Sequence, residues 1–375
     1  PDRIYAAAFR PPAAMLGSLY RISDGAMEAD LGGGLPRAVL DIAIDEASPS
    51  TLYVTTHLHG LFTSDDAGAS WKRLDDQGTG LPRTGYLDVD VDPRDPGTLY
   101  AASLCGPIPD YVIKPLRGVL SQSEPFSNID PDAACGLYRS RDGGASWELI
   151  LETLGEAKGV EVSAAAPGHI YVADGSGGVW VSRDDGATWR QENEGLGTTS
   201  VTAVTAGAER LYAGTQGSGV YVGTVAADGS IGWDGASSPR AYVYRIQIEI
   251  DPRDPQRLYA SAYPGGVLRS DDGGRTRAAK NFLTPSIRVD DPTLQGYYAM
   301  DIDPADPDTV WLGVYGKGLI LSRDGRDFGT FANGKDGLLR GAHITAVEVD
   351  PRDRKHVFVG AEEGVFVTAD AGKTW

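Results

Sequence analysis

The sequence predicts an all-β protein, a β-propeller made of four-stranded antiparallel blades, and three observations lead to this fold class. One short run, Ser/Thr-x-Asp-x-Gly-x-Ser/Thr-Trp, returns along the chain, and Asp142 and Asp184 in two of its copies lie 42 positions apart. A repeat period in the forties is typical of propeller blades. Each repeat also contains short runs of alternating apolar residues, bounded by Gly, Pro and Asp, which indicate strands. Finally, no run keeps helical periodicity for more than about two turns.

The strands of one repeat can be placed in order along the chain. A first strand of alternating polarity runs into a Pro/Asp turn, as at 87–96 (LDVDVDPRDP), and a short apolar second strand follows, as at 98–102. The third strand, as at 136–140, leads into the aspartate run, and the fourth strand begins at its Trp. The aspartate runs occupy 64–71, 140–147, 182–189 and 368–375, with altered copies at 270–277, where Arg replaces Trp, and at 322–328, which is one residue shorter.

The aspartates of these runs are predicted to support turns and not to react. A short Asp side chain accepts hydrogen bonds from nearby backbone N–H groups, glycine tolerates positive φ, and a Ser or Thr hydroxyl adds another local bond. The Trp provides a large apolar face for packing at the blade edge. We therefore assign a structural role to Asp66, Asp142, Asp184, Asp272, Asp324 and Asp370.

The number of blades is less definite than the fold. Degenerate copies near Asp24 and Asp228 bring the repeats to eight, and strand counting gives about 30 strands, where seven blades use 28 and eight use 32. Seven blades with a spare hairpin is the expectation, and eight blades is the alternative. The continuous repeat favours a single propeller domain over residues 1–375, and its incomplete first and last units suggest a segment of a longer chain.

With these runs, the chain resembles the Asp-box, or bacterial neuraminidase repeat, propellers. The resemblance covers nearly the whole chain. That superfamily includes sialidases, xyloglucan-degrading enzymes, the sortilin luminal domain and photosystem II assembly factors. The resemblance implies the fold, but a fold alone does not imply an activity.

Composition excludes several classes of function. The net charge of −18 disfavours nucleic acid, whose phosphates require a basic face, and it also disfavours anionic lipid surfaces. The chain has no run of 18 apolar residues, so no membrane-spanning helix is expected. His57 and His59 have the spacing of a metal-binding pair on a strand, but no third ligand is evident, and we expect neither a metal nor a cofactor.

The two cysteines bracket the single large insertion, residues 106–134. Cys105 ends a second strand and Cys135 begins the third strand of the same hairpin, and such neighbours lie at a distance that a disulfide requires. We predict a Cys105–Cys135 bridge, which would place the protein in an oxidising location: secreted, periplasmic or at the cell surface. Two unrelated thiols are the alternative.

The loops after the second and fourth strands vary most, so we expect function on that side of the blades. Arginines recur at one position of the loop between the fourth strand and the next first strand, and Arg suits carboxylate, phosphate or sulfate. Tyrosines near the same side suit stacking on sugars or anchoring a protein. The candidate ligand-binding residues are Arg37, Arg83, Arg240, Arg340, Tyr86, Tyr242, Tyr263 and Tyr315.

Carboxylates on the predicted first strands form a second candidate group. They could line a central channel and bind a cation, or they could be solvated polar positions of the strands. The residues are Asp88, Asp90, Glu161, Glu249, Asp301 and Glu348.

Three functions fit the sequence. The sialidase signature Arg-Ile-Pro is absent near the N-terminus, which weakens a sialidase. A xyloglucanase-like hydrolase needs two opposed carboxylates, often between two propellers, and no motif marks them. Asp110, Glu124, Asp290, Asp291, Glu362 and Glu363 lie on the expected side. We favour a non-catalytic propeller that binds a protein or glycan through the variable loops, with glycoside hydrolysis as the alternative.

Overall fold

The computed structural model describes residues 4–8, 18–23, 26–30, 35, 39–45, 47–56, 60–75, 78–104, 130, 133–164, 166–207, 210–226, 230–234, 248–262, 266–274, 280–281, 298–314, 316–328, 330–335, 337–350, 353–361 and 364–375. Every regular element in these residues is a β-strand, and none of them forms a helix suited to crossing a membrane.

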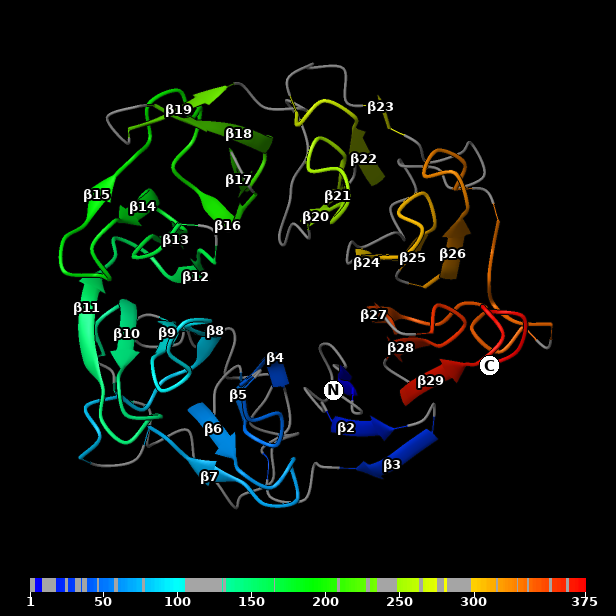
Figure 1. Ribbon diagram of the computed structural model, residues 1–375, viewed down its shortest axis with the longest axis horizontal. Helices are drawn as coiled ribbons and strands as arrows, with labels where there is room; N and C mark the ends of the chain where they lie inside the picture. The colour runs from blue at the N-terminus through cyan, green and yellow to red at the C-terminus, as the bar shows by residue number, and fades with distance from the viewer. Residues whose placement is uncertain are drawn as a thin grey trace. The chain divides into compact units, whose positions relative to one another are not determined.

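The described strands form eight antiparallel sheets, labelled in Figure 1. The first three sheets along the chain are β1 (Ile4–Ala8), β2 (Ser18–Ser23) and β3 (Ala26–Asp30); β4 (Val39–Ile44), β5 (Leu52–Thr56), β6 (Gly60–Ser64) and β7 (Lys72–Arg73); and β8 (Tyr86–Val91), β9 (Leu99–Ser103), β10 (Gly136–Ser140) and β11 (Glu148–Glu152). The next two are β12 (Ala157–Val162), β13 (Ile170–Asp174), β14 (Gly178–Ser182) and β15 (Arg190–Gln191); and β16 (Val201–Ala206), β17 (Arg210–Thr215), β18 (Gly219–Val225) and β19 (Ile231–Asp234). The last three are β20 (Ile248–Ile250), β21 (Leu258–Ala262), β22 (Gly266–Ser270) and β23 (Lys280–Asn281); β24 (Tyr298–Ile302), β25 (Val310–Val314) and β26 (Gly318–Ser322); and β27 (Ile344–Val349), β28 (Val357–Ala361) and β29 (Gly364–Thr368).

Strand order within each sheet follows chain order, which is the meander expected for a blade. The predicted all-β fold class with antiparallel blades is therefore confirmed. Seven sheets succeed one another from β4 to β29, and β1–β3 provides strands beyond them, in line with seven blades and a remainder. The single domain over residues 1–375, and its origin in a longer chain, stay predictions.

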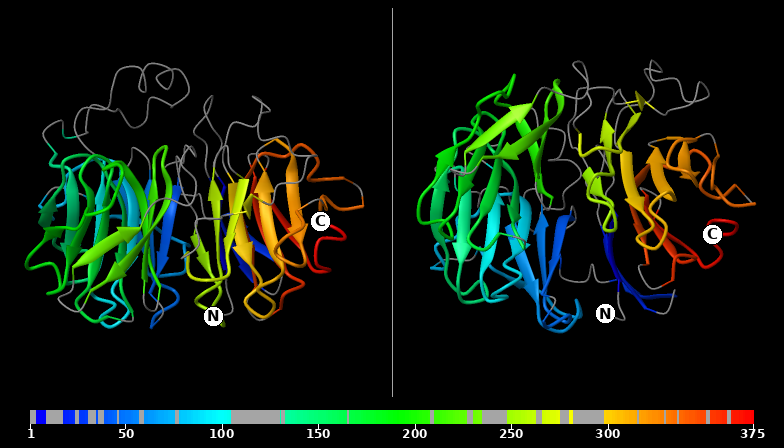
Figure 2. Two further views of the ribbon diagram at one scale, coloured as in Figure 1. Left: turned by 90° about the horizontal axis from the view of Figure 1, so that it is seen from above. Right: turned by 45° about the horizontal axis from the view of Figure 1, so that its top comes forward.

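The chain divides into two compact units. Unit 1 contains Pro1–Ser23, Met27–Glu192 and Thr199–Val204, and unit 2 contains Asp24–Ala26, Asn193–Thr198 and Thr205–Trp375. Within unit 1 the first strands β4, β8 and β12 contact each other in succession. Figure 2 shows the blue to green sheets of this unit side by side. Within unit 2, β24 contacts both β20 and β27. These consecutive sheets thus meet along their first strands.

Apolar side chains fill the space between consecutive sheets. In unit 1, Tyr53, Leu61 and Tyr86 belong to one buried cluster that joins the sheet β4–β7 to the sheet β8–β11. In unit 2, Trp311 and Val347 belong to a cluster that joins β24–β26 to β27–β29. The predicted second strands, with their short apolar runs, are buried along their whole length in β5, β9, β13, β25 and β28. Burial on both faces explains why these strands lack alternation.

Candidate functional site

The aspartate runs form compact turns at the ends of the third strands. In the run at 140–147, Ser140 Oγ donates to Asp142 Oδ1 at 2.8 Å, and Ser146 donates its N–H to Oδ1 at 2.8 Å and its hydroxyl to Oδ2 at 2.6 Å. Gly144 N donates to Ser140 Oγ at 2.8 Å. Hydrogen bonds from Ser146 and then Ser140 lower the pKa of Asp142 to about 2. Both carboxylate oxygens of Asp142 are therefore used within the turn.

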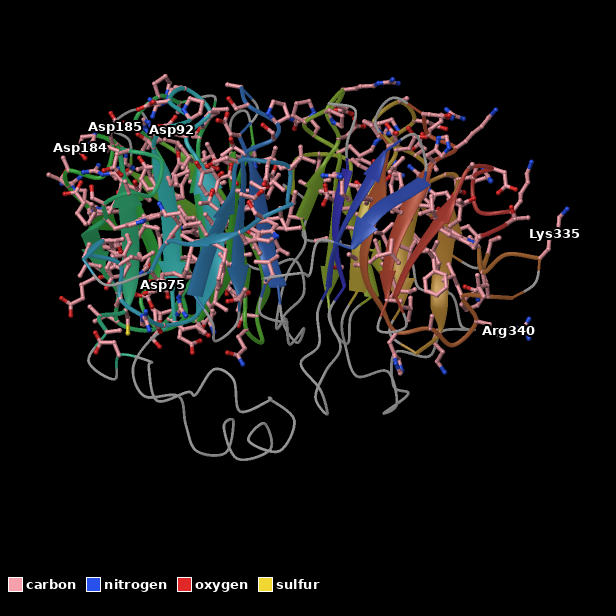
Figure 3. All side chains as sticks on the ribbon, turned by 90° about the horizontal axis from the view of Figure 1, so that it is seen from below. Asp75, Asp92, Asp184, Asp185, Lys335 and Arg340 are labelled. Atoms are coloured by element: carbon pink, nitrogen blue, oxygen red, sulfur yellow. The ribbon has the colours of Figure 1, made fainter. Side chains whose placement is uncertain are left out.

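The other aspartates of this set sit in turns of the same kind. Asp66, Asp184 and Asp370 accept the same side-chain and backbone bonds, Asp272 keeps the bond from Ser270, and Asp324 in the shorter run accepts the N–H groups of Arg326 and Asp327. In Figure 3, Asp184 lies with Asp185 and Asp92 at one end of the unit 1 sheets, and Asp75 lies at the opposite end. The geometry at each aspartate is that of a structural turn.

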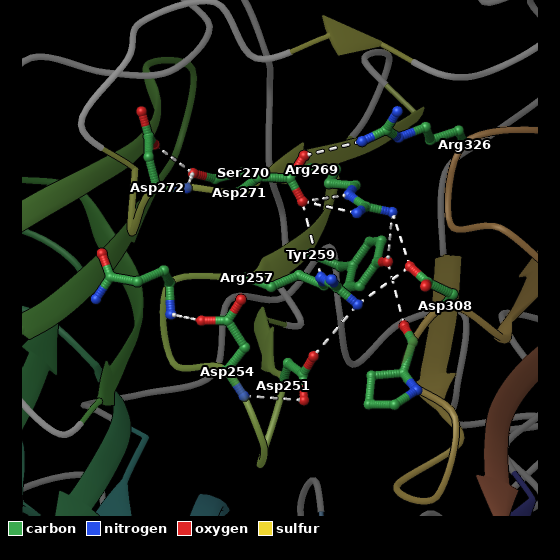
Figure 4. A network of polar contacts seen from close by, with 12 residues as sticks. Asp251, Asp254, Arg257, Tyr259, Arg269, Ser270, Asp271, Asp272, Asp308 and Arg326 are labelled. Atoms are coloured by element: carbon green, nitrogen blue, oxygen red, sulfur yellow. Dashed lines mark hydrogen bonds and ion pairs between the residues drawn. The ribbon is translucent and has the colours of Figure 1, made fainter.

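Arginines tie the aspartate turn of one sheet to its neighbours. The guanidinium of Arg269, with only 4% of its side chain exposed, contacts Asp271 at 2.7 Å, Asp308 at 3.3 Å and the hydroxyl of Tyr259 at 3.0 Å. Arg257 also reaches Asp308, at 3.1 Å (Figure 4). In unit 1 the guanidinium of Arg139 donates to the carbonyl of Asp185 and pairs with Glu148. These charges on the aspartate-turn side are engaged with one another.

Carboxyls on the first strands bond to the backbone of the next sheet. Asp90 Oδ2 accepts the N–H of Val162 at 3.0 Å, and Asp301 Oδ2 accepts the N–H of Val349 at 2.6 Å. Burial raises the pKa of both aspartates to about 6. Burial, and then the charge of Asp301, raise the pKa of Glu348 to about 7, although its side chain remains accessible to solvent. The first strand of each sheet is an edge strand with unpaired backbone N–H groups, and these carboxyls accept hydrogen bonds from some of them.

Asp41 on β4 and Asp88 on β8 also link consecutive sheets. Asp41 Oδ2 accepts the N–H of Val89 at 3.0 Å, and Asp88 Oδ2 accepts the N–H of Val160 at 2.8 Å. Burial, and then the charge of Asp41, raise the pKa of Asp88 well above its usual value. We did not predict Asp41, although aligning residues 40–45 (LDIAID) with residues 87–92 (LDVDVD) would have matched it to Asp88.

Both ends of the predicted insertion are bound to one short segment, residues 83–85. The carbonyl of Arg83 accepts the N–H of Asp130 at 2.8 Å, and the carbonyl of Gly85 accepts the N–H of Leu104 at 2.9 Å. Thr84 Oγ1 donates to the carbonyl of Leu104 at 3.3 Å. We call residues 83–85, Leu104, Asp130 and 133–135 the insertion base. The predicted binding residue Arg83 therefore lies at the root of the insertion.

Asp75 is buried beside this base. Arg73 holds its carboxylate through two bonds, Nε to Oδ1 at 2.6 Å and Nη2 to Oδ2 at 2.9 Å. Burial raises the pKa of Asp75, and the charges of Arg73 and Arg83 oppose that rise. Arg83 thus lies within electrostatic reach of a buried carboxyl.

An exposed leucine is fixed next to the insertion base. Thr153 N donates to the carbonyl of Cys135 at 3.0 Å, and the following Leu154 exposes 73% of its surface. The fully buried Asp174 accepts the N–H groups of Leu154 at 2.9 Å and Gly155 at 3.0 Å. No repeated motif in the sequence marks this arrangement. A rigid loop therefore presents an apolar side chain to solvent.

The remaining predicted residues divide into described and undescribed ones. Tyr86 is fully buried and its hydroxyl donates to Pro82 O at 2.6 Å, so it is a core residue in this structure. Arg340 is exposed in a turn closed by its N–H bond to Gly337 O. Outside the described residues lie Arg37, Arg240, Tyr242, Tyr263, Tyr315, His57, His59 and Cys105, together with Asp110, Glu124, Asp290, Asp291, Glu362 and Glu363.

The predicted Cys105–Cys135 bridge stays a prediction, because only Cys135 is described. Two findings bear on it. No cysteine in the described part of the chain is free. The hairpin is also present as expected, since Ser103 Oγ accepts the N–H of Gly136 at 2.9 Å next to Cys135.

Comparisons with known proteins support the fold but do not identify an activity. No family model matches this chain. A stretch of 137 residues, 34% of the chain, is 28% identical to a probable oligoxyloglucan-reducing end-specific xyloglucanase of Neosartorya fischeri. The corresponding enzyme of Emericella nidulans is 28% identical over 138 residues. The matched stretch covers 17% of the length of each of these relatives.

Solved structures match nearly the whole chain. YCF48 bound to D1 peptide superposes with a TM-score of 0.54 at 14% identity, covering 98% of this chain and 96% of that one. The GH74 xyloglucanase of Xanthomonas campestris gives a TM-score of 0.54 at 17% identity, covering all of this chain and 65% of the enzyme. The chain has a β-propeller fold. At these identities the likeness shows the fold alone, and it includes a peptide-bound protein as well as glycoside hydrolases.

Proposed function

We propose that this chain is an Asp-box β-propeller of an extracytoplasmic protein, and that it binds a protein or glycan partner without catalysis through the loops around the insertion 106–134. The observation that carries the proposal is the insertion base. Both ends of a long insertion are hydrogen-bonded to residues 83–85, and Leu154 is held exposed beside it. A partner would bury this leucine and use Arg83 for a carboxylate, phosphate or sulfate group.

Two further observations favour binding over catalysis. On the aspartate-turn side, the guanidinium groups of Arg269 and Arg139 are already paired with carboxylates of their own unit. Asp41 and Asp88 each accept a backbone N–H group of the next sheet, which gives both carboxyls a structural role. A partner-binding propeller is also consistent with YCF48, whose peptide-bound structure has a similar fold.

The extracytoplasmic location rests on the Cys105–Cys135 bridge. A bridge over this loop would add about 3–4 kcal/mol of stability in the loop-entropy model. Thiol titration of the denatured, unreduced protein should find no free thiol. Two free thiols would contradict both the bridge and the argument for the location.

The binding proposal is tested with a glycan array and a displayed peptide library, each probed with the purified chain. Substitution L154S should weaken the strongest interaction about tenfold, since an anchor side chain typically contributes more than 1 kcal/mol. I44S is the matched control, because Ile44 is also exposed, at 37%, but lies at the end of β4 that leads into the Pro/Asp turn, whereas residues 83–85 precede the start of the first strand β8. Equal effects of L154S and I44S would place the partner elsewhere, and no binding in either screen would contradict the proposal.

Glycoside hydrolysis is the second candidate, favoured by the 28% identity to xyloglucanases. A hydrolase would release reducing ends from xyloglucan oligosaccharides, and this is measured with the same protein. If the chain releases reducing ends steadily, and if changing one carboxyl to its amide abolishes this release, the protein is an enzyme and the binding proposal is wrong.

A further inference from the structure

Asn333 is the one asparagine in the sequence that is followed by glycine. The others, Asn128, Asn193 and Asn281, precede residues with larger side chains. An asparagine can lose its side-chain amide when the backbone nitrogen of the next residue attacks Cγ and closes a five-membered ring. A side chain on that next residue hinders the attack, and glycine has none. The pair Asn333–Gly334 is therefore the place in the sequence where this reaction is chemically easiest.

The fold holds both carbonyl groups of Asn333. Its Oδ1 accepts the N–H of Leu319 at 2.8 Å, and its backbone oxygen accepts the N–H of Leu339 at 3.2 Å. Asn333 exposes only 9% of its surface and lies over the start of β26, where an added Cβ on Gly318 would overlap Oδ1. Ring closure makes Cγ tetrahedral and displaces Oδ1 from this packed position. The bond from Leu319 and the packing therefore oppose the reaction while the turn is closed.

The same turn fastens the aspartate run at 368–375. The carbonyl of Ala332 accepts Trp375 Nε1 at 2.7 Å, and the N–H of Lys335 donates to the carbonyl of Lys373 at 3.0 Å. Trp375 also packs edge-on against the buried ring of Trp311, with 6.5 Å between the ring centres. Asn333 and Gly334 thus lie between the two residues that hold this run, so release of the run would free the turn.

We propose that Asn333 is a site of spontaneous deamidation, and that the contacts between its turn and the run 368–375 control the rate. The nitrogen of Gly334 forms a bond to Cγ of Asn333, the bond from Cγ to Nδ2 breaks, and Nδ2 leaves as ammonia with the proton of the Gly334 nitrogen. Water then opens the succinimide at either carbonyl and gives aspartate or isoaspartate. The net change is the gain of one water and the loss of one ammonia, so no oxidant or reductant takes part.

Aspartates that precede glycine in the aspartate runs are protected in a different way. Asp142 precedes Gly143, but closing the same ring on a carboxyl group requires the protonated acid, because the leaving group is then water. Hydrogen bonds from Ser146 and then Ser140 lower the pKa of Asp142 to about 2, so almost none of it is protonated at neutral pH. Asn333 carries an amide, and its protection depends on the closed turn.

Conversion would change this turn in two ways. Either product places a carboxylate where the neutral amide is buried, and burial of a charge is unfavourable. Isoaspartate also moves the Cβ methylene into the main chain, which lengthens the path from Ala332 to Lys335. These two residues hold the run 368–375, so isoaspartate should loosen its attachment.

The test follows conversion of each asparagine by peptide mass spectrometry while the full chain is incubated at mildly alkaline pH. In urea that unfolds the chain, Asn333 should convert faster than each of the other asparagines. In the folded chain its conversion should be at least about tenfold slower than in urea, because the turn must first open. W375F removes the N–H donor to Ala332 and should speed conversion in the folded chain about three- to tenfold, the effect expected for one hydrogen bond.

The matched control is W189F. Trp189 Nε1 donates to the carbonyl of Gly186 at 3.2 Å within its own aspartate run in unit 1, so this variant should convert Asn333 at the parent rate. Three results would overturn the proposal: faster conversion of another asparagine in urea, equal rates at Asn333 in the folded and unfolded chains, or equal rates in W375F and the parent. If W375F does not fold, the first two comparisons still decide, because both use the parent chain. No partner is needed, so this result and the test of partner binding are independent.

Discussion

The substitution D174N should destabilise the loop that presents Leu154. Asp174 is fully buried and accepts four hydrogen bonds, from the N–H groups of Leu154, Gly155 and Ser176 and from Trp180 Nε1, at 2.9–3.1 Å. Asparagine keeps one acceptor oxygen and directs an NH2 group at the donors of the other. About two buried donors would lose their partner, each at a cost of about 1–3 kcal/mol, so we expect a loss near 4 kcal/mol.

Urea unfolding followed by circular dichroism measures this loss, and hydrogen exchange locates it. The midpoint should fall with little change in slope, and the peptide with Leu154 and Gly155 should lose the most protection. The control is E152Q, which alters an exposed carboxyl on the neighbouring strand β11 and should stay within about 0.5 kcal/mol of the parent. If D174N stays within about 1 kcal/mol as well, the four bonds do not carry the loop, and the reasoning fails.

Two further predictions concern turns and charges. G80A should lower the free energy of unfolding in urea by at least about 2 kcal/mol more than G78A does. Both glycines have positive φ (84° at Gly80 and 96° at Gly78), but only at Gly80 would a Cβ overlap the carbonyl of Trp147. Similar losses of stability in the two variants would refute the overlap. Carbon-detected NMR titration should show Asp142 ionising near pH 2 and Asp90 near pH 6. The lowered pKa of Asp142 means that its hydrogen bonds stabilise the fold above the pKa of the unfolded chain, and that this stability is lost on acidification. The raised pKa of Asp90 has the opposite effect, so Asp90 favours the fold more at lower pH. Coincident midpoints would contradict the structural roles given to them.

Much of the fold could be read from the sequence, because its signals are local and repeated. The strands Gly136–Ser140 and Gly364–Thr368 begin and end where the repeat predicts, since Gly and the Ser/Thr-x-Asp run mark their limits. The strand Val310–Val314 was predicted from its apolar run after the Pro/Asp turn. The aspartate turns were predictable for the same reason: Asp142, for example, accepts hydrogen bonds from Ser140 and Ser146, which lie within four positions of it.

The candidate site was predicted only in part. Arg83 was named for its recurrence in the loops, and it does lie at the insertion base, but Tyr86, named for its ring, is buried in the core. Residues that act through distant partners escaped the sequence analysis. Asp174 accepts a hydrogen bond from Leu154, twenty positions away in the sequence, and Asp41 accepts one from Val89 in the next sheet. No local sequence pattern indicates either of these contacts.

The carboxyls that bond from one first strand to the next bear on how such a chain could lengthen. Asp90 reaches Val162 and Asp301 reaches Val349, each directed from a sheet to the sheet that follows it. The aspartate acceptor and the backbone N–H donor lie at corresponding positions of their repeats. A duplicated unit would therefore contain both an acceptor for the following sheet and a donor for the preceding one. Gene duplication could therefore add or remove whole units without any compensating substitution at the seam.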